Sequence, residues 1–215
     1  MPRLTPELIL AAYAQGVFPM AAGARSRHLH WFSPERRGII PLEGFHASRS
    51  LHRRRRRGLE TGAGRVPFRF ACNEAFDAVL AACADRPETW INPEIAQVFG
   101  DLHRQGLAHS VEVWAGPRLV GGVYGLALGG AFFAESMFSA VTDGSKMALA
   151  ELVARLASGG YVLLDTQYLT PHLTSLGGIE IPRAAYLRQL ERALAVPADP
   201  QRAFGPAGQR AERKP

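Results

Sequence analysis

The sequence predicts an α+β fold in which helices flank a mixed β-sheet. Two apolar, glycine-containing runs, Leu119–Leu128 and Ala131–Phe138, are separated by Gly129-Gly130, which is typical of a two-residue β-hairpin with a primed turn. A helix with one apolar face begins near Ser145, and a further apolar run, Tyr161–Gln167, follows it. Because hairpin, helix and strand come in this order, we expect the last strand to be reached by a crossover helix, which makes the sheet mixed.

Three polar side chains interrupt these apolar strands. They are Glu135 in the hairpin, and Asp165 and Gln167 at the end of the last strand. Polar residues in otherwise apolar strands usually mark a functional site. These three residues are therefore the first candidates for a site.

The chain divides into three parts. Thr5-Pro6-Glu7 is a strong helix start, since threonine can cap, proline fits the first helical position and glutamate complements the helix dipole. The segment after Gly16 has the character of a lid, so we expect residues 1–40 to form a small N-terminal subdomain and residues 41–195 the larger domain. Residues 196–215 are rich in Pro, Ala, Gly, Arg and Lys and are expected to form a disordered basic tail.

Capping and turn signals place the remaining elements. Strands are expected over Gly38–Leu42 and Pro67–Cys72 and around Val111 and Val113, turning at Gly116. The expected helices are a basic one capped by Ser48, Phe76–Cys83 capped by Asn73, one opened by Asn92-Pro93-Glu94 and ending at Gly106, a short turn over Pro171–Leu176, and a last helix opened by Pro182.

The composition fits an ordinary soluble globular protein. The 215 residues are 47% hydrophobic and 20% charged. No apolar run approaches the roughly 20 residues that span a bilayer, and the N-terminus has no signal-peptide pattern, so we expect a cytoplasmic protein without membrane contact. Cys72 and Cys83 have neither metal-ligand spacing nor an extracellular context, so neither a zinc site nor a disulfide framework is expected.

A net charge of +6 favours a polyanionic partner, although charge alone does not distinguish nucleic acid from a membrane surface. The main basic feature is the helix that Ser48 caps. Its five successive arginines cannot share one face, whereas Arg49, Arg53 and Arg56 or Arg57 can. The run is either a solvated surface feature or a patch for phosphate backbones, and the global charge favours the patch. Its members are Arg49, Arg53, Arg54, Arg55, Arg56 and Arg57.

A strand, hairpin, helix and strand core is similar to that of acyl-CoA N-acyltransferases, the GNAT-like fold, which bind pyrophosphate at a helix N-terminus. Their Gln/Arg-x-x-Gly-x-Gly/Ala loop is replaced here by Ala140–Ser145, which weakens the CoA hypothesis. The sequence has no Gly-x-Ser-x-Gly elbow, Walker loop, dinucleotide fingerprint or metal-ligand pair. It therefore predicts no cofactor and no metal.

Short motifs are spread along the chain up to about Leu194. They are Gly16-Val17-Phe18-Pro19, Trp31-Phe32-Ser33-Pro34, Phe45-His46-Ala47-Ser48-Arg49-Ser50, Thr89-Trp90-Ile91, His109-Ser110-Val111-Glu112-Val113-Trp114, Val120-Gly121-Gly122-Val123-Tyr124-Gly125, Glu135-Ser136-Met137-Phe138-Ser139 and Asp165-Thr166-Gln167. The last two are highly specific together. In this order the motifs closely resemble the leucyl/phenylalanyl-tRNA–protein transferases.

The resemblance implies a GNAT-like catalytic domain that uses aminoacyl-tRNA in place of acyl-CoA. The family moves leucine or phenylalanine from charged tRNA to the N-terminal arginine or lysine of a protein, which marks that protein for degradation. Aminolysis of an ester needs no metal or nucleotide. The expected partners are charged tRNA and acceptor proteins, and we expect a monomer. The alternatives are a CoA-dependent N-acetyltransferase and a non-catalytic RNA-binding protein.

Roles for the polar residues follow from the resemblance together with strand geometry. Asp165 and Gln167, two residues apart, are expected to point to one face, where Asp165 orients Gln167 and the attacking amine. A neutral amide is a poor base, so Gln167 is expected to position the amine and polarise the ester. Glu135 offers negative charge to a cationic acceptor, or alternatively forms a structural ion pair with Lys146 or an arginine.

The aminoacyl side chain requires an apolar pocket sized for leucine or phenylalanine. Phe132 and Met137 have opposite strand parity, so lining one cavity from both requires a bulge or twist. Met20 and Phe99 stand where relatives often have tryptophan and tyrosine, which bears on contacts to the terminal adenosine. By resemblance the pocket is drawn from Trp90, Val123, Phe132, Met137, Leu149, Leu152 and Leu164, each of which is alternatively a plain core residue.

Overall fold

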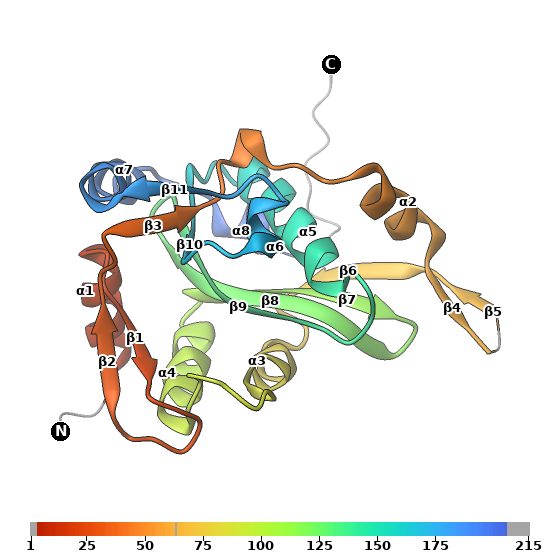
Figure 1. Ribbon diagram of the computed structural model, residues 1–215, viewed down its shortest axis with the longest axis horizontal. Helices are drawn as coiled ribbons and strands as arrows, with labels where there is room; N and C mark the ends of the chain where they lie inside the picture. Colours follow the sequence, from red (N-terminus) through yellow and green to blue (C-terminus); the bar gives the residue numbers. More distant parts are fainter. Residues whose placement is uncertain (1–3, 63, 206–215) are drawn as a thin grey trace.

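A seven-stranded mixed sheet lies at the centre of the protein, with helices on both of its faces (Figure 1). The structure is a computed structural model that describes residues 4–62 and 64–205. The strands of this sheet are β3 (Arg36–Ile39), β6 (Phe68–Cys72), β7 (Ala108–Ala115), β8 (Arg118–Leu128), β9 (Ala131–Ser139), β10 (Leu163–Gln167) and β11 (Ile179–Pro182). Their order across the sheet is β11-β3-β10-β9-β8-β7-β6. The predicted α+β architecture, a mixed sheet flanked by helices, is confirmed.

The predicted hairpin, helix and strand form the middle of this sheet. Gly129 has a φ of +54°, as a primed turn between β8 and β9 requires. Helix α5 (Gly144–Ser158) then crosses from β9 to β10, and β10 runs parallel to β9 with Leu163 opposite Ala131. The other strand pairs of the described sheet are antiparallel, so this crossover makes the sheet mixed.

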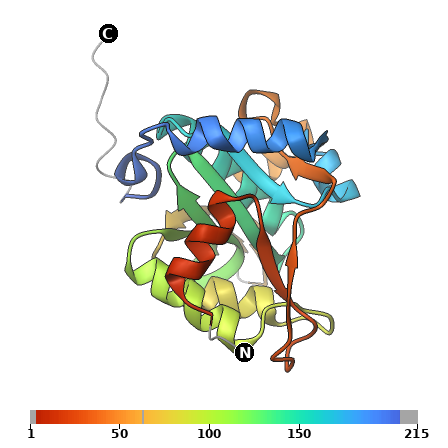
Figure 2. The ribbon, with the colours of Figure 1, turned by 90° about the vertical axis from the view of Figure 1, so that its left-hand side faces the viewer.

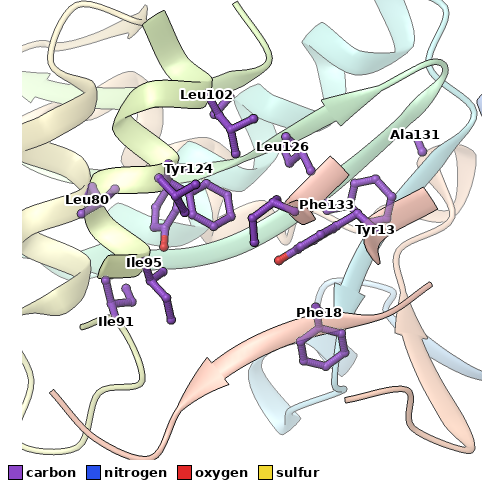
Figure 3. Packing of buried hydrophobic residues seen from close by; sticks show 14 of the residues in the cluster. Tyr13, Phe18, Leu80, Ile91, Ile95, Leu102, Tyr124, Leu126, Ala131 and Phe133 are labelled. Atoms are coloured by element: carbon purple, nitrogen blue, oxygen red, sulfur yellow. The ribbon is translucent and has the colours of Figure 1, made fainter. Parts of the chain in front are cut away.

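Two apolar clusters fill the space between the sheet and its helices. One cluster joins the sheet to α1 (Pro6–Ala14), α3 (Phe76–Ala84), α4 (Pro93–Arg104) and α7 (Arg183–Leu194). In it, Tyr13 meets Phe133 edge to face with ring centroids 5.0 Å apart, and Phe18 lies nearby (Figure 3). The second cluster lies under α5. Alternating side chains of β9 supply both clusters, since successive residues of a strand point to opposite faces.

The N-terminal helix begins and ends where the sequence predicts. Thr5 caps α1, and its Oγ1 accepts the N–H of Leu8 at 3.3 Å. The helix lies between α4 and α7 (Figure 2). It ends before Gly16, whose φ is +74° and where a side chain would collide with Tyr186 and Leu187 of α7. Glycine is therefore required at this position by both backbone and packing.

The strands that follow α1 belong to two different sheets. β1 (Phe18–Ala21) and β2 (Leu29–Phe32) form a separate antiparallel pair. β3 lies in the large sheet between β10 and β11, so the predicted boundary at residue 40 falls just after a strand of the larger domain. The predicted strand over Gly38–Leu42 in fact begins at Arg36. The division of the chain into a small N-terminal subdomain and a larger domain stays a prediction.

Besides Thr5 at the start of α1, two further predicted helix caps are confirmed and one is wrong. Ser48 and Asn92 cap their helices as expected. Helix α3 starts after Ala75, whereas Asn73 has a φ of +60° and accepts the N–H of Ser110 through Oδ1 at 3.1 Å. The remaining elements are α2 (Arg49–Arg57), α6 (Pro171–Thr174), the short helix η1 (Leu42–Gly44) and the hairpin of β4 (Leu59–Thr61) and β5 (Gly64–Val66).

The C-terminal segment contains a helix that the sequence analysis missed. Helix α8 (Pro200–Phe204) is capped by Asp199, which accepts the N–H of Arg202 at 3.0 Å. Phe204 is buried and stacks on His109 with ring centroids 4.1 Å apart. The prediction of a disordered tail from residue 196 is therefore wrong over 196–205, because one capping residue and one large apolar side chain outweigh the composition. Residues 206–215 lie outside the described part of the chain.

We expect Phe204→Ala to lower the free energy of unfolding by about 3 kcal/mol or more. Truncation of a large buried aromatic side chain removes apolar contacts and leaves a cavity. Urea unfolding measures the change. Gln201→Ala, at an exposed position of the same helix, is the matched control and should unfold like the parent. An unchanged midpoint for Phe204→Ala would mean that α8 does not pack against the protein in solution.

Candidate active site

A cavity of about 420 Å³ opens where β9 and β10 end. Phe18 and Met20 of the N-terminal strand β1 form part of its wall, together with the loop before α4 and helix α6. The structure thus brings residues from distant parts of the sequence to one place. Five predicted site residues line it: Trp90, Val123, Glu135, Met137 and Gln167.

The other predicted pocket residues do not reach the cavity. Phe99, at a position linked to adenosine contacts, is fully buried against Tyr124, whereas Met20 does line the cavity. The four remaining residues are core residues, which was the alternative to a role in the pocket. Phe132, Leu149, Leu152 and Leu164 lie in the apolar cluster under α5.

Glu135, which lines the cavity, is the extra residue of a β-bulge in β9. Tyr124 pairs with Ser136 and Gly125 with Ala134, so Glu135 is an extra residue without an opposite partner. A side chain at Gly125 would come within 2.1 Å of the Phe133 carbonyl oxygen, so the strand opposite the bulge requires glycine.

The bulge also reverses the alternation of side chains along β9. Before it, Phe132 lies in the cluster under α5 and Phe133 in the opposite cluster. After it, Met137 packs against the cluster under α5 and Phe138 against the other. The expectation that a bulge is needed to bring Phe132 and Met137 to the same face is confirmed.

Glu135 is a buried carboxyl group at the cavity wall. It is 9% exposed, and burial raises its pKa to about 8. Lys146, its expected structural partner, pairs instead with Asp143 at 3.3 Å. The hydroxyl of the fully buried Tyr13 interacts with this carboxyl and lowers its pKa, whereas the Tyr124 hydroxyl has no hydrogen-bond partner among the described residues. A buried carboxyl with so few polar partners suits a polar or cationic ligand group.

Asp165 lies outside the cavity, in a buried network. Its carboxylate pairs with Arg37, whose Nη2 lies 2.7 Å from Oδ2, and accepts the hydroxyl of Tyr186 at 2.6 Å. Its Oδ1 accepts the backbone N–H of Gln167 at 2.8 Å. Asp165 therefore orients Gln167 through its backbone, and the expected direct contact with an attacking amine is not possible from this position.

Gln167 occupies the cavity wall with a left-handed backbone. Its φ is +58°, and the pairing register with β3 shifts between Asp165 and Gln167. The expectation that these two side chains share one face is wrong, because the period of two holds only for a regular extended strand. With its amide nitrogen facing the carbonyls of Ala134 and Thr166, Gln167 donates to both, at 2.9 and 3.1 Å.

The arginines of the basic helix α2 fall into two groups, those in ion pairs and those exposed without one among the described residues. Arg54 lies 3.3 Å from Asp143, and Arg55 pairs with Glu151 and stacks on the ring of Phe70 at 4.1 Å. The other arginines are exposed and form no ion pair within the described residues, and they are the ones that share the predicted face. They are Arg49, Arg53, Arg56 and Arg57.

A second hollow lies beside α2, and two carboxylates, Glu60 and Asp143, line it as well as arginines. Arg53, Arg54 and Arg57 line this hollow together with Asp143, the residue before α5. Ser145, two residues further on, lines the cavity itself. The two hollows are therefore lined by residues two positions apart at the start of α5.

Several residues of the site were missed by sequence reasoning. Arg37 and Tyr186 hold Asp165, Tyr13 and Tyr124 lie near Glu135, and Arg86 donates to the carbonyl of Met137 at the cavity wall. For Tyr13, Tyr124 and Tyr186 the only local signal of a role in the site was a polar hydroxyl on an otherwise apolar helix face or strand. Arg37 gives no such signal, since it follows another arginine in a polar stretch.

The described part of the chain contains neither a cluster of metal ligands nor a membrane-spanning helix. No group of three or more His, Cys, Asp or Glu residues there is arranged to hold a metal ion. Within residues 4–62 and 64–205, no helix combines the length and apolar character needed to cross a bilayer.

Two family models match successive parts of the chain. The leucyl/phenylalanyl-tRNA protein transferase model matches residues 39–191, and the model of the N-terminal domain of the same transferase matches residues 3–35. The chain belongs to the leucyl/phenylalanyl-tRNA protein transferase family. It is therefore an aminoacyltransferase, and the family is consistent with aminoacyl transfer from tRNA to proteins.

Curated relatives of this transferase are similar over almost their whole length. Leucyl/phenylalanyl-tRNA–protein transferase from Cereibacter sphaeroides is 55% identical, over 96% of this chain and 91% of the relative. The proteins of the same name from a Ruegeria species and from Paramagnetospirillum magneticum are each 55% identical, over 91% and 89% of this chain and 90% of each relative.

Solved structures are less similar to the transferase. L-PGS from Bacillus licheniformis is 12% identical with a TM-score of 0.38, over 74% of this chain and 51% of that chain. A C-terminal DUF2156 domain from Agrobacterium fabrum is 10% identical with a TM-score of 0.42, over 93% of this chain and 62% of that chain. These scores are too low to carry an argument, and the GNAT-like assignment stays a prediction.

The buried carboxyl of Glu135 should make the stability of the transferase depend on pH. Its pKa is about 8 in the folded protein and roughly 4.3 in an unfolded chain. Between these values the folded state binds more protons than the unfolded state, so stability falls as pH rises. The stability that the folded protein gains from keeping Glu135 protonated is fully present below about pH 4 and is lost above about pH 8.

We therefore expect the parent to lose roughly 3–4 kcal/mol of unfolding free energy relative to Glu135→Gln between pH 5 and pH 9. Glutamine has the same shape and does not titrate, so it isolates this one group. Urea unfolding of both proteins at the two pH values is the measurement. Parallel pH dependence in the two proteins would show that Glu135 titrates normally.

Proposed function

We propose that this transferase moves leucine or phenylalanine from charged tRNA to the N-terminal arginine or lysine of acceptor proteins. Family membership supports the reaction class. The observation that carries the finer proposal is Glu135, a buried carboxyl without an ion-pair partner among the described residues, at the wall of an otherwise mainly apolar cavity. A cationic acceptor side chain would supply the missing partner and keep the carboxylate ionised.

The reaction requires little chemistry from the protein. The acceptor amine attacks the ester carbonyl carbon of the aminoacyl-tRNA, the amide C–N bond forms, and the ester C–O bond breaks. The ribose oxygen leaves with the proton that the amine gives up. Because the ester is already activated, positioning of the amine against the carbonyl is the main contribution expected of the enzyme.

Gln167 is suited to hold the amine. A glutamine amide has two N–H donors and one oxygen acceptor, and in the amide orientation that the neighbouring carbonyls favour, both donors bond to Ala134 and Thr166. The oxygen is the remaining group, and it accepts a hydrogen bond from the amine. We therefore assign Gln167 to positioning of the amine, one of the two roles that the sequence suggested, and not to polarisation of the ester, for which no N–H donor is left.

The apolar part of the cavity would take the donor side chain. Val123, Met137 and Leu173 line it, and its volume lies within the roughly 300–1,000 Å³ of typical ligand pockets. Methionine side chains adapt to ligands of different shape, and Met20 and Met137 both face this space. A pocket of this kind accommodates both the branched leucine and the planar phenylalanine.

The CoA-dependent alternative loses support at the N-terminus of α5. There the N–H of Ser145 is already bonded to Ser139 Oγ at 2.7 Å. Asp143 lies at the same end, paired with Arg54 and Lys146. A pyrophosphate would meet a carboxylate where acyl-CoA enzymes offer free N–H groups. The marking of acceptors for degradation, the cytoplasmic location and the monomeric state stay predictions.

The direct test offers labelled leucyl-tRNA, phenylalanyl-tRNA or acetyl-CoA together with a peptide that begins with arginine. Transfer from the charged tRNAs alone is expected. Transfer from acetyl-CoA alone would support the acetyltransferase alternative, and tRNA binding without transfer would support the RNA-binding alternative.

Glu135→Gln should specifically reduce the use of acceptors that begin with arginine or lysine. Loss of a charge-assisted hydrogen bond of roughly 1.5–3 kcal/mol corresponds to a decrease of about 10- to 100-fold in selectivity for arginine over norleucine. Competition between two otherwise identical peptides measures it. If the variant discriminates between them as well as the parent does, Glu135 does not bind the acceptor.

The exposed face of α2 should bind the tRNA backbone. We expect neutralisation of Arg53 and Arg57 to glutamine to weaken tRNA binding with little dependence on tRNA sequence. The slope of log affinity against log salt should decrease by roughly 0.7–0.9 for each phosphate that an arginine no longer neutralises. The matched control neutralises Arg188 and Arg192, which are exposed on α7. If neutralising either pair of arginines changes tRNA affinity and its salt dependence equally, α2 is an ordinary solvated surface and not the tRNA-binding face.

A further inference from the structure

A fully buried ion pair connects the end of β10 to β3. Arg37 and Asp165 are 1% and 0% exposed, and Arg37 donates from Nε and Nη2 to the two carboxylate oxygens at 2.9 and 2.7 Å. Nη1 donates to the Gly16 carbonyl at 3.0 Å. The guanidinium carbon lies 4.6 and 4.5 Å from the ring centroids of Phe18 and Tyr186. These contacts hold Arg37 in a single orientation.

The acceptor positions of the Asp165 carboxylate are occupied. Oδ1 accepts from Arg37 Nε at 2.9 Å and from the Gln167 N–H at 2.8 Å. Oδ2 accepts from Arg37 Nη2 at 2.7 Å and from the Tyr186 hydroxyl at 2.6 Å. A carboxylate offers about four such positions. Asp165 therefore has no acceptor left for the substrate amine and acts through Gln167.

Gln167 depends on this carboxylate for its conformation. A φ of +58° is uncommon for a non-glycine residue and persists where surrounding contacts determine it. The hydrogen bond from the Gln167 N–H to Asp165 is one such contact. The same backbone turn places the amide against the carbonyls of Ala134 and Thr166 at the cavity wall. A displacement of Asp165 would therefore reach the Gln167 side chain directly.

We propose that Arg37 is a positioning residue of the aminoacyl transfer reaction, an inference that rests on the proposed function. Arg37 fixes Asp165, Asp165 fixes the backbone of Gln167, and the Gln167 amide oxygen is thereby held where it accepts from the amine. Lysine cannot replace arginine here. A planar guanidinium makes a two-point contact with a carboxylate while it stacks on rings, whereas an ammonium offers a single nitrogen.

Arg37→Lys tests the proposal because it keeps the charge and removes the fixed pair of hydrogen bonds. The single-turnover rate of transfer from leucyl-tRNA to an arginine-initiated peptide should fall by roughly 10²-fold at saturating peptide, the effect of about 1 Å of misplacement. The KM for peptide and the affinity for tRNA should change little. Arg36→Lys is the matched control: Arg36 precedes Arg37 on β3, is exposed and lies 3.7 Å from Glu180.

Combination with Gln167→Ala separates positioning from a general structural role. If Arg37 acts through Gln167, Arg37→Lys slows the parent strongly but has little further effect in the Gln167→Ala background. Equal slowing in the two backgrounds would overturn the proposal. A parental rate for Arg37→Lys would overturn it as well.

A crystal structure of Arg37→Lys decides the question without an activity measurement. Gln167 should leave its positive φ or release the Ala134 carbonyl, and an unchanged Gln167 would overturn the proposal. Failure of the parent to use either charged tRNA would overturn the proposed function instead, and this structure would still decide the role of Arg37. If Arg37→Lys does not fold, Tyr186→Phe removes one hydrogen bond from the same carboxylate. It should slow transfer by roughly 2- to 10-fold, and a parental rate would contradict the proposal.

Discussion

The buried ion pair between Arg37 and Asp165 is the interaction on which the arrangement of the site depends. It joins β3 to β10 and, through the Gly16 carbonyl and the Tyr186 ring, reaches the end of α1 and the face of α7. A buried ion pair is tolerated only where geometry is good and the remaining polar atoms are satisfied. Hydrogen bonds from Tyr186 and Gln167 meet that condition for Asp165. The same bonds that satisfy the carboxylate also place Gln167 at the cavity.

A second constraint, the extra residue in β9, decides which side chains meet the cavity. A regular strand would send Met137 to the face that Phe133 occupies. With the bulge, Met137 packs on the side of α5, whereas Glu135 stays beside Tyr13, which packs on Phe133. Bulges are frequent beside active sites because they change the direction in which side chains of a strand point. The glycine opposite, at position 125, leaves the room that this distortion needs.

Local sequence signals predicted most of the fold but only part of the site. Periodicity, caps and the Gly129 turn depend on neighbouring residues, so the hairpin, the crossover helix and β10 were found. Burial of a charge depends on distant residues instead. Arg36 and Arg37 are adjacent arginines, yet the first is exposed and the second is fully buried because Asp165, Gly16, Phe18 and Tyr186, all distant in sequence, surround it. The polar exceptions in the strands identified Glu135 and Gln167, whereas the left-handed backbone of Gln167 had no signal in the sequence.

Assembly of the active end of the sheet requires almost the whole chain. Leu4 bonds to Glu94, Arg37 pairs with a carboxylate 128 positions further on, and that carboxylate is completed by Tyr186. Such long-range contacts form only after large loops have closed. During synthesis, residues 4–164 can emerge while Arg37 still lacks its counter-ion. A nascent chain therefore cannot complete the network around Asp165 until Tyr186 has left the ribosome, and an N-terminal fragment would carry an unpaired arginine where the finished protein has a closed core.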